Sequence, residues 1–162
     1  MQRTEKIPKS NVNDTLKKTE AEKREVAALQ AKLRSRITPL SASQACQILD
    51  LDQGDPIRTM QAIANSGKVL GYDVNGETIY PSFQFDRENR CIYPVMERFI
   101  QLLDQKNGPY YLLYFLVTKN KIFAGAAPKD CIVSQSDRVF TEYRNEIIRR
   151  EQIWEHIDAW AL

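Results

Sequence analysis

The sequence has little of the chemistry on which metal sites depend. Its 162 residues contain one histidine, His156, and three cysteines. Cys46, Cys91 and Cys131 are far apart and form no C-x-x-C pair. This excludes the common zinc spacings and indicates reduced, mostly buried thiols, as in a cytosolic protein. We therefore expect no bound metal.

Familiar catalytic signatures are missing as well. The chain has no G-x-S-x-G, no glycine-rich phosphate loop and no H-E-x-x-H. A Cys–His pair would have to combine His156 with Cys131, and a lone histidine in a C-terminal helix is more often a surface residue. We expect a protein that is not an enzyme and that uses no cofactor.

Long apolar runs are also absent. The longest, Tyr110–Val117, has eight residues, whereas a membrane-spanning helix needs about 20. The N-terminus is charged and lacks the apolar segment of a signal peptide. These features predict a soluble, cytoplasmic protein without a membrane partner.

Charge is unevenly distributed, although the formal net charge is only +2. Residues 1–36 carry ten Lys or Arg against five Asp or Glu, and residues 37–86 carry two against six. A basic N-terminal arm suits non-specific contact with phosphates. The acidic segment that follows argues against a nucleic-acid surface there.

A hairpin with a helical unit after it organises residues 71–94. Asn75-Gly76 separates two short alternating runs, and this dipeptide favours a type I′ turn, in which both residues have positive φ. Pro81 has no N–H to donate and ends the strand. If the chain stays extended, Phe83 and Phe85 point to one face and Gln84 points away from it.

Two short helices precede this hairpin. Ser41–Gln44 reads as a capping box, and this helix reaches about Leu49. Asp55-Pro56 then predicts an N-cap followed by proline at the first helical position, and Gly67 predicts the end near Ser66. The buried side of the second helix should contain Ile57, Met60 and Ile63 or Ala64.

Helix, turn, helix and hairpin together resemble the small winged unit of the MerR and excisionase group, over about residues 38–81. The resemblance implies that the second helix enters the major groove of DNA with Arg58, Gln61 and Asn65. Arg suits guanine, and Gln or Asn suits adenine. Lys68 completes the predicted DNA-binding set. The alternative is a helical layer that reads no DNA, because a groove-binding unit normally carries more phosphate-contacting cations.

The N-terminal part predicts disorder over residues 1–12 and a helix from about Asp14 to Arg36. One narrow apolar seam follows the helical period, formed by Val26, Leu29, Leu33 and Ile37. The seam either packs on the body of the protein or pairs two copies of the helix.

The C-terminal part predicts three helices. The first runs from Pro94 to Lys106, and the second, Tyr110–Thr118, is apolar almost all round and therefore buried. After a turn with Cys131, Ile132 and Val133 directed inward, the last helix runs from about Ser136 to His156. Its apolar face should contain Val139, Phe140, Tyr143, Ile147 and Ile148.

A spaced pattern in this part is similar to a known family. Tyr80-Pro81-Ser82-Phe83-Gln84-Phe85, an apolar helix, then Asn120 and Gly125 with Pro128 and Asp130, resembles the toxin-binding domain of the ParS/MbcA/Xre type of antitoxins. The resemblance covers about residues 78–133. It implies a protein that neutralises a toxin of the RES type, which acts on NAD, and that represses its own operon.

The same resemblance implies that Gly125, Pro128 and Asp130 shape a loop beside the partner, with Asp130 capping a short helix. The chain departs from the family in having tyrosines instead of tryptophan in the buried helix, and in continuing for some thirty residues after Asp130. Trp154 and Trp160 in this extension need a cover, and either the protein's own body or a partner can supply it.

We therefore predict a mostly helical α+β protein with three parts, residues 1–37, 38–91 and 92–162. The predicted function is that of an antitoxin-like transcriptional regulator, a homodimer that binds double-stranded DNA and a partner protein. The alternative is an interaction protein, such as a mobile-element accessory protein, that does not bind DNA.

Overall fold

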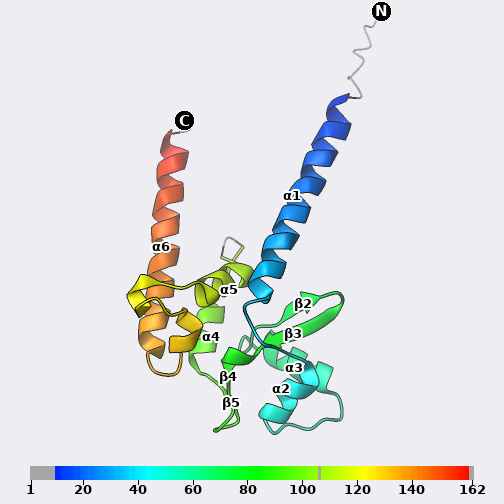
Figure 1. Cartoon of the computed structure of the whole chain (residues 1–162), viewed down its shortest axis with the longest axis vertical. Helices are drawn as coiled ribbons and strands as arrows, with labels where there is room; N and C mark the ends of the chain where they lie inside the picture. The colour runs from blue at the N-terminus through cyan, green and yellow to red at the C-terminus, as the bar shows by residue number, and fades with distance from the viewer. Residues whose placement is uncertain (1–9, 106, 161–162) are drawn as a thin grey trace, which may run out of the picture.

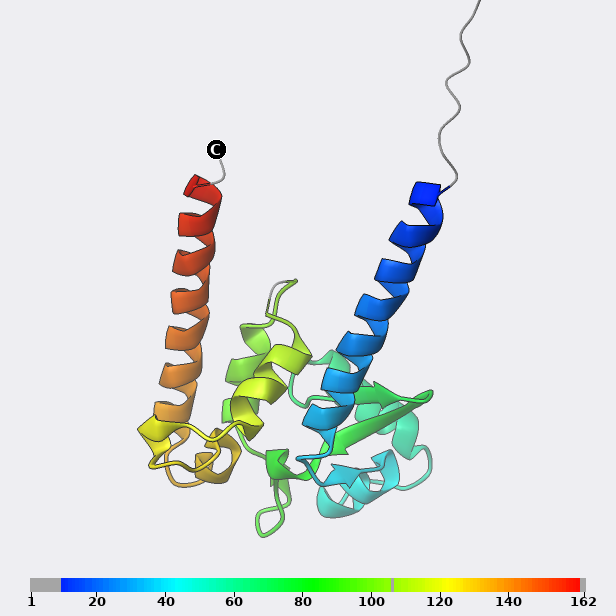
Figure 2. The same ribbon diagram turned by 45° about the horizontal axis from the view of Figure 1, so that its top comes forward.

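The body of the molecule is a small α+β unit from which two long helices extend. The structure, a computed structural model, describes residues 10–105 and 107–160, and the side chains of residues 19–105 and 107–152. The long helices are α1 (Ser10–Arg34) and α6 (Ser136–Trp160), and both extend to the same side of the body (Figure 1 and Figure 2). The predicted class, α+β with mostly helices, is confirmed.

The predicted helix-turn-helix is present as α2 (Ala42–Ile48) and α3 (Pro56–Asn65). Ser41 caps α2 in a complete capping box with Gln44. Asp55 caps α3, and its side chain accepts a hydrogen bond from the backbone N–H of Arg58 at 3.1 Å. These caps satisfy N–H groups that the first turn of a helix cannot pair internally, which is why both starts were predictable.

The predicted hairpin is formed by β2 (Tyr72–Val74) and β3 (Glu77–Pro81), with β1 (Pro39–Leu40) on the other side of β3. All pairs are antiparallel. Asn75 and Gly76 have φ values of 52° and 85°, as the turn requires. The hairpin therefore follows α3 directly, as a wing would.

Gln84 differs from its predicted orientation. Residues Ser82–Gln84 form a 3₁₀ turn, η1, before the short strands β4 (Phe85–Asp86) and β5 (Cys91–Ile92). Gln84 is fully buried, and its amide bonds both the N–H and the C=O of Leu70, at 2.7 and 2.9 Å. We expected an extended strand in which Gln84 points away from the face of Phe83 and Phe85, but the 3₁₀ turn replaces that strand. The bonds to the backbone of Leu70 make the burial of Gln84 favourable.

The helical half contains α4 (Val95–Gln101) and α5 (Pro109–Val117), followed by the 3₁₀ turns η2 (Lys121–Phe123) and η3 (Pro128–Cys131). The first predicted helix was too long: α4 ends before Lys106. The carboxylate of Asp104 accepts a hydrogen bond from the backbone N–H of Asn107 at 2.6 Å, and this local turn replaces a further helical turn. Helix α5 is buried along most of its length, as predicted.

Two hydrophobic clusters hold the body together. The first lies under α2, α3 and β3, and its buried members are Leu40, Ala42, Ala45, Cys46, Met60, Val69, Tyr80 and Phe85. The second is larger and is centred on α4, α5 and the first turns of α6, but Leu70 and Tyr72 also belong to it. The segment around the hairpin thus contributes to both clusters, and the predicted boundary at residue 91 stays a prediction.

The seam of α1 is covered only at its C-terminal end. Leu33 is buried and Ile37 packs against the second cluster, whereas Val26 and Leu29 are 54% and 56% exposed. The helix begins at Ser10, so residues 10–12 are helical and not disordered as predicted. Residues 1–9 lie outside the described part of the chain.

Three further expectations about the C-terminal part were wrong. Val133 is 73% exposed and does not point inward, and Ile148 is exposed on α6. Neither residue packs against the second cluster, whereas Val139 and Tyr143 are fully buried in it. The last helix also continues to Trp160, past the predicted end at His156. Cys46 and Cys131 are buried as expected, but Cys91 is exposed.

Candidate functional site

The outer face of α3 gathers the predicted DNA-binding residues. Arg58, Gln61 and Asn65 are spaced three and four positions apart and are all exposed, and Lys68 is exposed just after the helix. Among the described residues, none of these four side chains forms a hydrogen bond or an ion pair. The opposite side of the helix is fixed by Met60, which is fully buried. The helix therefore presents a polar face that is free to bind.

Ile57 adds an apolar side chain to the start of α3. It was predicted to be buried, but it is 72% exposed. The spacing places Ile57 on the same side as Met60 and Ala64. It lies in the first turn of the helix, however, and this turn does not pack against the core. Met60, Ile63 and Ala64 alone pack against the first cluster.

The surroundings of α3 are acidic. Asp52 and Asp55 are exposed before the helix, and Asp73 and Glu77 are exposed on the hairpin. One of these carboxylates is hydrogen-bonded within the hairpin, since Asp73 accepts a hydrogen bond from the Thr78 hydroxyl at 2.8 Å. A phosphate backbone approaching this face would thus meet a few cations among several carboxylates.

The predicted partner-binding residues lie in the turns that follow α5. Asn120 organises the first turn: its side chain accepts a hydrogen bond from the N–H of Ile122, and its C=O accepts one from the N–H of Gly125, each at 3.0 Å. Gly125 is exposed and has a φ of 83°, a conformation that favours glycine. A side chain at this position would meet no neighbouring atom. Glycine is therefore favoured here by the backbone conformation of the turn and not by lack of space.

Pro128 and Asp130 lie in η3, but they differ in environment. Pro128 is buried, whereas Asp130 is exposed and pairs with Lys129 at 2.7 Å. No side chain caps η3. The predicted capping role of Asp130 is therefore wrong, because its carboxylate is directed to Lys129. Trp154 and Trp160 belong to α6, but their side chains lie outside the part that the structure describes.

A groove of about 540 Å³ lies beside these turns. It is formed by the segment after α1, the end of α5, and η3 with the residues before it. The lining residues are Arg36, Val117, Thr118, Lys119, Ala126, Ala127, Lys129 and Asp130. Arg36, Lys119 and Lys129 were not singled out from the sequence, because only the fold brings them together.

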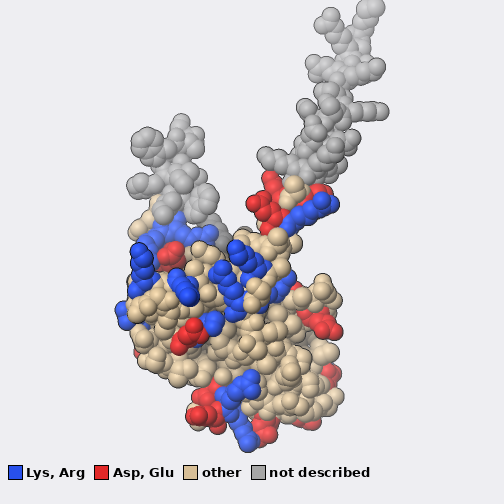
Figure 3. Space-filling model, viewed as in Figure 1, with Lys and Arg blue, Asp and Glu red and all other residues tan. Residues whose placement is uncertain are grey.

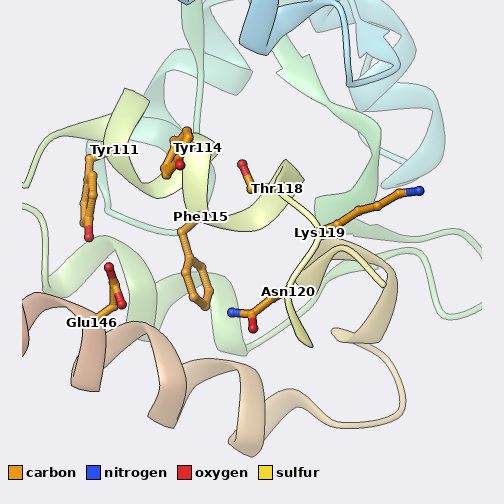
Figure 4. Close-up of a pocket in the computed structure, with 7 residues that line it drawn as sticks. All are labelled: Tyr111, Tyr114, Phe115, Thr118, Lys119, Asn120 and Glu146. Carbon is orange, nitrogen blue, oxygen red and sulfur yellow. The ribbon is translucent and has the colours of Figure 1, made fainter. Parts of the chain in front are cut away.

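A smaller pocket of about 160 Å³ lies next to it, between α5 and α6, and shares Thr118 and Lys119 with the groove (Figure 4). Tyr111 and Phe115 project from α5 toward α6, and Glu146 points back toward Tyr111 (Figure 4). Burial raises the pKa of the Tyr111 hydroxyl above its ordinary value of 10.0, so this hydroxyl stays neutral next to Glu146.

The described residues contain no group of three or more His, Cys, Asp or Glu side chains that could hold a metal ion. In the same part of the chain, no helix combines the length and apolar character that crossing a membrane requires. Comparisons with family models, with curated proteins and with solved structures found no match.

Proposed function

We propose that this chain is an antitoxin-like transcriptional regulator. It binds double-stranded DNA with α3 and the β2–β3 hairpin, and it binds a protein partner with the turns around Gly125, Pro128 and Asp130. The partner that the antitoxin resemblance implies is a toxin of the RES type. The regulator acts as a homodimer, since operators usually contain two symmetric half-sites.

The observation that carries the DNA-binding part is the polar face of α3. Arg58, Gln61 and Asn65 extend into solvent from the second helix of a helix-turn-helix, and no other described residue engages them. Arg can bond O6 and N7 of guanine, and Gln and Asn can bond N6 and N7 of adenine. Solvated surface helices also present polar faces, but here the residue types are those that a base-reading helix requires.

The partner-binding part is supported by the groove next to Asp130. It is concave, it is lined by both charged and apolar side chains, and it lies between segments that are distant in sequence. Co-expression with the protein encoded by the neighbouring reading frame, followed by light scattering, tests this part. A stable complex with a growth-inhibiting neighbour is the expected result.

The DNA-binding part is tested by selection from a pool of duplexes with random central sequences. We expect the full chain to enrich one motif, and Arg58→Ala to weaken binding to that motif by about 1–3 kcal/mol while leaving binding to a scrambled duplex unchanged. Fluorescence anisotropy at fixed salt measures both affinities.

Arg144→Ala is the matched control, because Arg144 is an exposed arginine on α6, away from α3. It removes the same charge and should leave both affinities unchanged. If Arg58→Ala weakens all duplexes equally, or none, α3 does not read bases and the proposal fails for DNA.

The acidic surroundings of α3 favour a second candidate, an interaction protein in which the winged unit is only a scaffold. In that case the selection enriches no motif, and the co-expressed partner still binds. The two experiments together distinguish the two functions.

A further inference from the structure

The groove beside α5 concentrates positive charge. Arg36, Lys119 and Lys129 line it with a single carboxylate, that of Asp130, so three cations face one anion. Asp130 pairs with Lys129 at 2.7 Å. Arg36 and Lys119 are exposed, and neither has an ion-pair partner among the described residues. Two positive charges of the groove are therefore available to a ligand.

The surroundings reinforce this charge. Lys and Arg side chains gather over the upper half of the face shown in Figure 3, between the bases of α6 and α1, where α5 and the turns after it lie in Figure 1. Asp and Glu side chains lie among them, but Lys and Arg predominate (Figure 3). An excess of one sign around a recess raises the local concentration of ligands of the opposite sign. The face therefore attracts anions.

The rest of the groove is apolar except for Thr118. Val117 and Ala127 are buried, and Ala126 is half-buried. Since these small side chains leave room, an apolar side chain of a ligand could lie on them while its charged neighbours reach the cations at the rim. Such a mixture of apolar surface with a few placed polar groups is typical of binding sites.

We propose that this groove binds an extended acidic segment of the partner protein. Asp or Glu side chains of the segment pair with Arg36 and Lys119, and an apolar side chain between them packs on Val117 and Ala127. This inference rests on the proposed partner-binding function and specifies the chemistry of the partner.

A peptide fits the groove better than a DNA backbone does. The groove, with a volume of about 540 Å³, is open to solvent along one side, so an extended chain can lie in it. The rigid phosphate backbone of a duplex cannot follow a recess of this kind. It would also meet Asp130, and it would leave the apolar surface of Val117 and Ala127 unused.

Panning a random peptide library displayed on phage against the full chain tests the proposal. We expect the enriched peptides to combine Asp or Glu with an apolar residue. A synthetic copy of the most enriched peptide should bind in fluorescence anisotropy, and its copy with Asn and Gln in place of Asp and Glu should not. Lys119→Glu and Arg36→Glu should each weaken binding by roughly tenfold. Arg144→Glu, which reverses an exposed charge on α6 outside the groove, should leave peptide binding unchanged.

Three results would overturn the proposal: enrichment of no peptide, enrichment without acidic residues, or a peptide whose affinity Lys119→Glu and Arg36→Glu do not alter. A fourth would be a loss of affinity for random duplexes in the same two variants without any effect on peptides, which would make the groove a phosphate-binding surface. If the co-expressed partner still binds to both variants, the partner-binding function survives and only the placement of its acidic segment fails. Circular dichroism and thermal unfolding of each variant show that the fold is retained.

Discussion

Tyr143 is a residue at which a polar atom opposes stability. Its side chain is fully buried among the rings of Phe99, Tyr111 and Phe115. Its hydroxyl has no hydrogen-bond partner among the described residues. A buried hydroxyl without a partner has lost its bonds to water and gained nothing in return.

We expect Tyr143→Phe to stabilise the protein by about 1 kcal/mol, because the change removes the unpaired hydroxyl and keeps the ring. Urea unfolding at neutral pH measures the difference. Tyr114→Phe is the control, since the ring of Tyr114 is about half exposed, and it should change stability little. A destabilised Tyr143→Phe would mean that the hydroxyl is bonded in solution.

The same residue predicts how stability depends on pH. Burial raises the pKa of the Tyr143 hydroxyl far above its ordinary value of 10.0. In the unfolded chain the hydroxyl ionises near pH 10, but in the folded protein it stays neutral. Below about pH 10 the hydroxyl is neutral in both states, and the free energy of unfolding does not depend on its ionisation. Above about pH 10 only the unfolded chain releases the proton, so the free energy of unfolding falls as the pH rises. Tyr143→Phe should show a shallower alkaline loss in urea unfolding, and an unchanged slope would contradict this assignment.

At the scale of elements, the turn η1 depends on one side chain. The amide of Gln84 donates to the C=O groups of Leu70 and Pro81 and accepts from the N–H of Leu70. It thereby fixes η1 to the segment before the hairpin. Without it, both backbone groups of Leu70 would be buried without these bonds.

We expect Gln84→Leu to destabilise the protein by about 2–4 kcal/mol, because each unsatisfied buried backbone group costs about 1–3 kcal/mol. Chemical unfolding measures the loss. Gln47→Leu makes the same chemical change at an exposed position of α2 and should be nearly neutral. Equal effects of the two substitutions would mean that the bonds of Gln84 contribute nothing specific.

Gln84 also shows where prediction from sequence stops. The helix starts at Ser41 and Asp55 and the turn at Asn75-Gly76 were predictable, since the groups that bond there are close in sequence. The hydrogen-bond partner of Gln84 is Leu70, 14 residues away, and no local sequence pattern predicts this contact. Ile57 was misplaced for a related reason, because helical spacing gives the side of a helix but not where the core beneath it ends.

At the scale of the whole molecule, the two candidate surfaces were not equally predictable. Arg58, Gln61 and Asn65 share one helix, so their spacing alone places them on one face. Arg36 and Lys119 meet in a groove only because α1 ends beside α5. A surface built from distant segments is a product of tertiary packing, and charge counts along the chain did not reveal it.

The long helix α1 points to self-association. Every side chain from Glu20 to Leu29 is exposed, so the described residues give this part of the helix little tertiary support in one copy of the chain. Isolated helices of such length are only marginally stable in water. Val26 and Leu29 continue the seam that Leu33 buries against the body, and a narrow seam of this kind is typical of paired helices.

We therefore expect the protein to be a dimer, and Leu29→Lys to convert it to a monomer, because a lysine in the seam would place a charge in the helix interface. Sedimentation equilibrium measures the mass. Ala31→Lys is the matched control: it adds the same charge to the same helix on the side opposite Val26 and Leu29, and it should leave the dimer intact. DNA binding should follow the mass, since a monomer reaches only one half-site of a symmetric operator. A wild-type chain that sediments as a monomer would exclude α1 pairing, and α1 would then need a different protein to cover Val26 and Leu29.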